Sequence, residues 1–178
     1  MRTSTRQNHT SIPDAVARIS TKVSTERIYG ALADIRRHGV WGGSMHKGKF
    51  GLSSVQAPVG AASVGTEFDS TGNDLGGTFT DHSVVTEAAR PHLFEFVTEG
   101  HLTPKKGAKW EGDTTIIHRY EIAEDGDGRT LSYRGHVARW TNPPWMLTLG
   151  LVRPLMRVMI NKGARKTLRN LVASADQH

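Results

Sequence analysis

The side chains best suited to chemistry in this sequence lie at alternating positions of three strand-like segments. Asp81 and Ser83 lie in the first segment, His118 and Tyr120 in the second, and Tyr133 in the third. In each segment they share the parity of large apolar residues, so we expect them to point to the same inward face. Imidazole and carboxyl groups transfer protons, and phenols donate hydrogen bonds to developing negative charge. The spacing therefore predicts a polar cluster on an otherwise apolar face.

Several other chemistries are excluded by the sequence. It has no cysteine, so disulfides, thiolate nucleophiles and Cys-ligated zinc are ruled out. Its nine histidines form no His-x-x-x-His or Glu-x-x-His motif, so we expect no metal site. Neither a Gly-x-Ser-x-Gly elbow nor a glycine-rich nucleotide-binding motif occurs. We accordingly expect no cofactor.

The elements that must position the cluster are mainly strands. Residues 15–23 alternate in polarity and predict a first strand, and Ser24 is a good N-cap for a helix over residues 25–37. A short second helix and a weak strand at 52–56 are expected next. Turn signals then separate strands predicted at 66–70, 79–87, 92–99, 114–122 and 130–138. This order is an antiparallel meander with one apolar face.

A long C-terminal helix is predicted to cover that face. Its inward seam begins with Pro154, Arg157 and Asn161 and continues with apolar residues to residue 175. Residues 143–175 contain six Lys or Arg and no Asp or Glu, which accounts for the whole net charge of +6. No aromatic platform interleaves with these charges, so a solvated face is favoured over nucleic acid. Arg153, Arg157 and prolines interrupt the apolar run before it, which argues against stable membrane insertion.

Length and composition indicate one domain. The 178 residues suit a single core, predicted over residues 14–178, behind a polar, disordered tail at 1–13. The tail lacks the apolar region of a secretory signal, so a cytoplasmic location is the default expectation. A monomer or a homodimer fits the sequence equally well.

Four segments carry a resemblance to a known family. They are Val-Gly-Thr-Glu-Phe at 64–68, the stretch 79–96 with Val-Thr-Glu and Pro-His-Leu-Phe-Glu-Phe, His-Arg-Tyr-Glu-Ile at 118–122 running to Gly128, and Pro-Leu-Met-Arg at 154–157 running to Leu-Arg-Asn-Leu at 168–171. With the element order, they resemble the START-like or SRPBCC superfamily, most closely its polyketide cyclase/dehydrase branch. The sequence departs from the usual pattern at Phe79 and His118, where Trp is frequent.

This resemblance implies an α+β helix-grip fold, in which a curved antiparallel sheet of about seven strands wraps around the long C-terminal helix. It also implies a ligand chamber between sheet and helix. Within it His118, partnered by Asp81, would transfer a proton, Tyr120 or Tyr133 would hydrogen-bond an enolate, and Arg157 would hold an oxyanion. The remaining expected ligand-binding residues are Trp41, Phe79, Ser83, Phe94, Phe96, Trp140, Trp145 and Asn161, with the proline-stiffened segment 140–145 either a lid or a wall pinned to the core.

Three functional hypotheses follow. The first is a domain that binds a hydrophobic, aromatic or polyketide-like molecule, with acid–base cyclisation or dehydration as its chemistry and antibiotic biosynthesis as its setting. The second is a non-catalytic carrier, or a protein that sequesters a lipid-like or toxic metabolite. The third is an interaction module that uses the basic helix on an acidic membrane or partner. The alternative for each polar residue is a packed core role with satisfied hydrogen bonds.

Overall fold

The computed structural model describes residues 12–42, 51–73, 77–105, 111–143 and 150–177. Seven antiparallel strands form one sheet in the order β1-β7-β6-β5-β4-β3-β2. Their bounds are β1 Ala15–Thr21, β2 Gly51–Gln56, β3 Glu67–Asn73, β4 Gly77–Ala89, β5 Leu93–Pro104, β6 Gly112–Asp125 and β7 Gly128–Trp140. The strand number and the antiparallel arrangement confirm the expected meander.

Two helical segments follow β1 and one closes the chain. Helix α1 spans Thr25–Ala33, and the Ser24 hydroxyl accepts a hydrogen bond from the backbone N–H of Arg27, as expected of an N-cap. A 3₁₀ turn at Ile35–Arg37 leads into α2, His38–Trp41. A second 3₁₀ turn, Gly150–Val152, precedes α3, Arg153–Asp176. The predicted single helix over 25–37 is therefore broken at Asp34, whose ψ of 76° is not helical.

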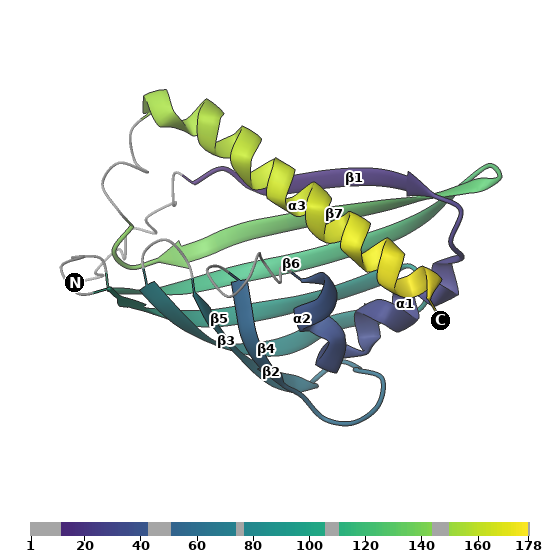
Figure 1. Ribbon diagram of the computed structural model, residues 1–178, viewed down its shortest axis with the longest axis horizontal. Coiled ribbons are helices and arrows are strands. Elements are labelled where there is room, and N and C mark those ends of the chain that lie inside the picture. The colour runs from purple at the N-terminus through teal and green to yellow at the C-terminus, as the bar shows by residue number, and fades with distance from the viewer. Residues whose placement is uncertain (1–11, 43–50, 74–76, 106–110, 144–149, 178) are drawn as a thin grey trace, which may run out of the picture.

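The sheet curves around α3, which crosses it diagonally above β1 and β7 (Figure 1). Register shifts leave Thr86 of β4 and Ala138 of β7 unpaired and mark bulges, which bend strands locally and add twist. Helices α1 and α2 lie beside the C-terminal part of α3 (Figure 1). The architecture is the α+β helix-grip arrangement that was expected.

The core fills the concave side of the sheet. Phe68, Phe94, Phe96 and Leu131 are at most 2% exposed, and they pack with Leu168 and the other buried residues of α3. The alternation along the strands agrees with the predicted parity, since Ser83, Val85, Tyr120, Ile122 and Leu131 are all buried. The buried residues of α3 are Ala164, Leu168, Leu171, Ser174 and Ala175.

No helix among the described residues is long and apolar enough to cross a membrane.

Candidate functional site

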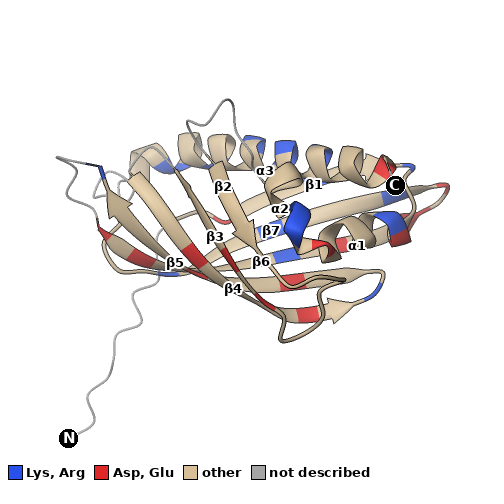
Figure 2. Ribbon diagram, turned by 60° about the horizontal axis from the view of Figure 1, so that its bottom comes forward, with Lys and Arg blue, Asp and Glu red and all other residues tan. Residues whose placement is uncertain are grey.

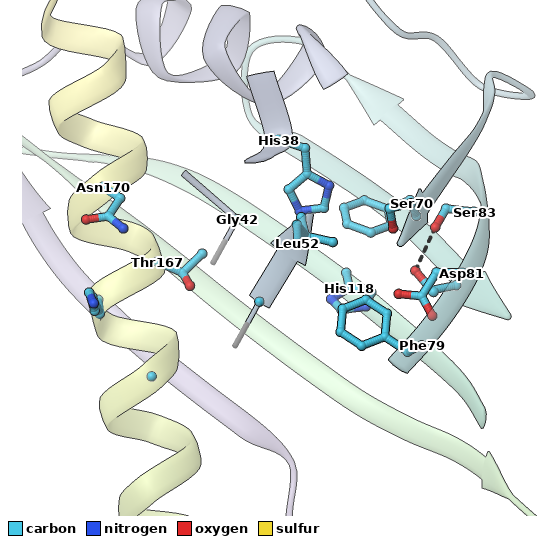
Figure 3. Close-up of a pocket in the computed structure, with 15 residues that line it drawn as sticks. His38, Gly42, Leu52, Ser70, Phe79, Asp81, Ser83, His118, Thr167 and Asn170 are labelled. Carbon is cyan, nitrogen blue, oxygen red and sulfur yellow. Dashed lines mark hydrogen bonds between the residues drawn. The ribbon is translucent and has the colours of Figure 1, made fainter. Parts of the chain in front are cut away.

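A pocket of about 330 Å³ opens between the sheet, α2 and α3 (Figure 3). The sheet supplies aromatic, hydroxyl and carboxyl groups, α2 supplies an imidazole, and α3 supplies an amide, a hydroxyl and an ammonium group. The lining residues are His38, Gly42, Gly51, Leu52, Ser70, Phe79, Asp81, Ser83, Phe96, Thr98, His118, Gly163, Lys166, Thr167 and Asn170. A volume of this size lies at the lower end of the range for small-molecule sites.

Glycines opposite two lining residues let their side chains lie flat on the sheet. Asp81 pairs with Gly100 across β4 and β5, and a Cβ at residue 100 would lie 2.5 Å from Asp81 Oδ1. Phe79 pairs with Gly72 across β3 and β4, and a Cβ at residue 72 would collide with the Phe79 ring. Side-chain positions in the pocket therefore depend on the absence of a neighbouring Cβ.

Asp81 carries a carboxyl group without a counter-charge. Within the described part of the chain, its side chain forms no hydrogen bond and no ion pair. Burial raises the pKa of Asp81 to about 6, because a charged carboxylate loses solvation there. A carboxyl group with a pKa near neutrality can both accept and return a proton, which is the property of a general acid–base group.

His118 is oriented by a neighbouring phenol. Its Nδ1 lies 2.9 Å from the Tyr133 hydroxyl, and its ring stacks on Phe96 with centroids 4.6 Å apart. Burial, reinforced by the nearby His38, lowers the pKa of His118 to about 3, and burial raises the pKa of Tyr133. Both groups are therefore neutral at pH 7. If the O–H of Tyr133 donates to Nδ1, the imidazole proton resides on Nε2.

His38 is a second imidazole at the pocket. It stacks on Trp41 with centroids 4.4 Å apart and meets Phe96 edge to face at 5.7 Å. Burial lowers the pKa of His38 to about 4, and its buried Nδ1 has no hydrogen-bond partner. A Cβ at Gly42 would collide with the ring, so the helix can fold the imidazole back only because residue 42 is glycine. An unpaired buried polar atom is rare in proteins and needs an explanation.

The structure does not make His118 and Asp81 hydrogen-bond partners. Asp81 of β4 pairs with Gly100 of β5, which pairs with Thr114 of β6. His118 lies four residues further along β6. Two strand spacings of about 4.8 Å and four residues of about 3.4 Å separate them on a flat sheet, which is too far for direct contact. The expected partnership is therefore replaced by His118 with Tyr133, and Asp81 stands alone at the other end of the same pocket.

The other residues expected at the site have varied positions. Phe79, Ser83 and Phe96 line the pocket, and the Ser83 hydroxyl is 2.9 Å from that of Thr98. Tyr120 and Phe94 are at most 2% exposed and belong to the core without lining the pocket. Trp41 is fully buried, donates from Nε1 to the Ala31 carbonyl, and reaches the pocket only through the His38 ring.

The polar half of the predicted helix seam lies outside the pocket. Arg157 is exposed and borders a separate groove with Ile12 and Pro13. Asn161 accepts a hydrogen bond from the backbone N–H of Val16, which fixes α3 to the edge strand β1. Helical periodicity placed Asn161 on the side of α3 that faces the sheet, but there it meets the edge strand β1 and not the pocket. Trp140 ends β7 and is not a lining residue, and Trp145 lies outside the described residues.

Sequence reasoning missed several lining residues. His38 is one of the nine histidines that fit no motif, and it follows a 3₁₀ turn, which gives no periodic pattern to mark its side. Lys166, Thr167 and Asn170 reach the pocket from α3, on the flank of the predicted seam. Their spacing of one and three residues was a usable signal, because it places them together on one side of a helix.

No group of three or more His, Cys, Asp or Glu in the described parts of the chain is arranged to hold a metal ion.

The fold and the pocket together define a class: a helix-grip α+β protein with a pocket between its sheet and C-terminal helix. No family model matches the chain, and no curated protein is similar to it in sequence. Solved structures do share the fold. The Mll3558 protein from Rhizobium loti is 14% identical, with 91% of this chain and 96% of that chain covered and a TM-score of 0.59.

Two further solved structures show the same likeness. A conserved protein from Geobacillus kaustophilus is 12% identical over 91% of this chain and 97% of that chain, with a TM-score of 0.60. The di-domain ARO/CYC StfQ from the steffimycin biosynthetic pathway is 15% identical over 92% of this chain, with a TM-score of 0.60. The match covers 50% of StfQ. At these identities the likeness shows a shared fold.

Proposed function

We propose that the protein binds an extended hydrophobic molecule, aromatic or polyketide-like, in the pocket between the sheet and α3, and that it transfers protons at an enolisable ketone of that molecule. The observation that carries the proposal is the pairing, in one pocket, of an unpaired carboxyl with a pKa of about 6 and a neutral, oriented imidazole. The fold that the chain shares with the ARO/CYC StfQ supports the same class of ligand.

Asp81 and His118 would have different roles in this reaction. The Asp81 carboxylate accepts the α-proton of the ketone, and the electrons of the broken C–H bond form the enolate. His118 Nε2–H donates a hydrogen bond to another carbonyl oxygen of the same molecule, at the far end of the pocket, since Tyr133 occupies Nδ1. In a cyclisation, the enolate carbon attacks a second carbonyl carbon of the same molecule, and Asp81 returns its proton to the new alkoxide. This division differs from the sequence-based hypothesis, in which His118 was the base.

The size and shape of the ligand follow from the spacing of these groups. A molecule that contacts both Asp81 and His118 must span the stretch of sheet between them, along Phe96 and Thr98. The aromatic ring of Phe79, which lines the pocket, suits planar rings. The imidazole of His38 and the amide of Asn170 line the helix side of the pocket and can provide further polar contacts. We therefore expect a flat ligand of two to three fused rings or its unfolded equivalent.

A deuterium-exchange experiment tests the proposal without knowledge of the natural ligand. The probe is 2-tetralone in deuterated buffer, with loss of its α-proton signals followed by NMR. The protein should accelerate exchange, and Asp81→Asn should reduce the acceleration about a hundredfold or more, because a general base contributes that much. Asp69→Asn is the matched control, since Asp69 lies on the outer face of the same sheet and bonds His82.

A second function, non-catalytic carriage or sequestration, is favoured by one observation. His38 and His118 are neutral at pH 7, so among the described lining residues Asp81 alone has a pKa shifted to near neutrality. Binding of planar ketones with no acceleration of exchange in the wild-type protein would select this function and exclude the enzymatic one.

A further inference from the structure

Helix α3 is packed along only part of its length. Its buried residues all lie from Ala164 onward. Of the eight exposed large apolar side chains in the described part of the chain, four lie at residues 151–159. They are Leu151, Leu155, Val158 and Met159, with 96%, 64%, 65% and 61% of their surface exposed. Helices α1 and α2 lie at the other end of α3 and leave these turns uncovered (Figure 1).

The exposed apolar residues form one face with the basic residues of the helix. Leu155, Val158 and Met159 are spaced by three and four residues, and the same face continues through Lys162, Arg165, Lys166 and Arg169. All seven residues are exposed. We call this face, Leu155 to Arg169, the outer stripe. It is apolar in its first two turns and basic in the next two, where Lys166 also borders the mouth of the pocket.

The charge around the outer stripe has one sign. Residues 150–175 contain six Lys or Arg and no Asp or Glu, and acidic residues return only at Asp176 (Figure 2). A solvated basic face does not require large apolar side chains beside it. Apolar side chains next to Lys and Arg on one helical face are typical of helices that lie in the surface of an anionic bilayer. A contiguous exposed apolar group of this kind marks an interaction site.

We propose that the outer stripe docks the protein on an anionic lipid surface. Leu155, Val158 and Met159 enter the boundary between headgroups and acyl chains, and the four basic residues bind lipid phosphates. The inference goes beyond the proposed function and does not depend on it. It concerns docking at the surface, which needs no membrane-spanning helix.

Charge favours lipid over protein occupants of the outer stripe. In a two-fold contact with a second copy, the stripe would face the same stripe, and the Lys and Arg residues would repel one another. Glu67, Asp69 and Glu99 surround His82 on the outer face of the sheet, so they do not neutralise the basic residues of the stripe. The outer stripe is also convex, so a fluid surface covers its side chains more fully than a rigid partner would.

Vesicle co-flotation tests the inference. The probes are vesicles of phosphatidylcholine alone and of equal parts phosphatidylcholine and phosphatidylglycerol. We expect binding to the anionic vesicles, little binding to the neutral ones, and a steep fall in affinity as salt rises to about 0.5 M. The double variants Leu155→Ser/Met159→Ser and Lys162→Gln/Arg165→Gln should each weaken binding about tenfold or more.

Matched controls distinguish binding through the outer stripe from non-specific adsorption to vesicles. Val59→Ser/Val64→Ser removes two apolar residues that are 87% and 62% exposed elsewhere, and Lys22→Gln removes an exposed charge; neither should change binding. Because every substituted residue is exposed, circular dichroism should show unchanged folding. Absent vesicle binding, or binding that the stripe variants leave intact, would overturn the inference. If vesicles do not bind, two further results would also overturn the inference. One is concentration-dependent dimerisation that the stripe variants abolish, and the other is complex formation with an acidic protein that they abolish.

Discussion

Asp81 lies directly opposite Gly100 on neighbouring strands, and its carboxyl oxygen occupies the space where a Cβ at residue 100 would be. The glycine gives the carboxyl group room to lie across β5 toward the pocket. Thr114 flanks the same glycine from β6, with its hydroxyl 3.5 Å from the Gly100 carbonyl. The position of the candidate acid–base group is therefore set by a residue that carries no chemistry of its own.

Replacing Gly100 with alanine should displace the Asp81 carboxyl group. We expect Gly100→Ala to weaken binding of planar ketones about tenfold and to lower α-proton exchange further, because a displacement of about 1 Å is enough to disturb proton transfer. Titration by tryptophan fluorescence and the exchange assay measure the two effects. The control is Gly30→Ala, since nothing lies within 4 Å of a Cβ there and α1 should gain about 0.5 kcal/mol. Unchanged exchange in Gly100→Ala would contradict the assigned role of Asp81.

Asp81→Asn should stabilise the protein at neutral pH. The folded-state pKa of about 6 lies above the ordinary value of 3.8, so the folded protein holds the proton more tightly than the unfolded chain. Stability therefore falls as pH rises from about 4 to about 6, by about 2 kcal/mol after allowance for solvent near the pocket mouth. Asparagine removes this cost.

Urea unfolding at two pH values measures the effect. At pH 7.5 we expect Asp81→Asn to be more stable than the wild type by about 2 kcal/mol, and at about pH 4 the two proteins should be equally stable. The low-pH comparison is the internal control, because the carboxyl group is then protonated. A variant that is less stable at pH 7.5 would show that Asp81 has a stabilising partner.

The strand pattern was predictable because one face of the sheet is buried. Alternation placed Asp81, Ser83 and His118 on the inward face, and the structure has them there, because a shift of one residue would turn every side chain outward. Ser24 was a recognisable helix start for the same local reason. The fold class followed from the order of these elements and their separation by turn residues.

The limits of prediction were set by features that no local pattern encodes. Periodicity along α3 identified its inward side but not where the sheet ends beneath it, so Arg157 and Asn161 were expected in the pocket and lie outside it. The His118–Tyr133 contact joins adjacent strands, which parity allows but does not single out. The glycines at 72 and 100 are visible in the sequence as turn or strand residues, yet their role depends on the register of the neighbouring strand.

His38 and His118 should remain neutral far below the ordinary histidine pKa. Burial lowers the pKa of His38 to about 4 and that of His118 to about 3, so both should show constant NMR ring shifts from pH 8 down to about 5. The unfolded chain binds protons at these sites below pH 6.5, so their contribution to stability is complete above pH 6.5 and is lost as pH falls. His82 is the control: its hydrogen bond to Asp69 raises its pKa above 6.5. Titration of His118 near pH 6.5 would contradict its burial.

Tyr133→Phe should remove the hydrogen bond that favours one tautomer of His118. In the wild type the phenol O–H donates to Nδ1, so nitrogen NMR should show a protonated Nε2 and an unprotonated Nδ1. Without the phenol we expect both tautomers and a stability loss of about 1 kcal/mol. Tyr29→Phe, at a phenol that lies beside Arg90, should leave the His118 signals unchanged. Equal tautomer populations in the wild type would show that Tyr133 does not orient the ring.

The two halves of α3 should respond differently to loss of an apolar side chain. Leu168 is 0% exposed and packs in the core, whereas Leu155 is 64% exposed. Leu168→Ala should lower the free energy of unfolding by about 2–5 kcal/mol, because it removes buried methyl groups and leaves a cavity. Leu155→Ala should change it by less than about 0.5 kcal/mol, as expected of a surface position. Urea unfolding of both variants measures the difference, and a comparable loss for Leu155→Ala would mean that the first turns of α3 are packed against another part of the chain. Stability that is insensitive to Leu155 while vesicle binding depends on it would assign the first turns of α3 to docking and the last turns to the fold.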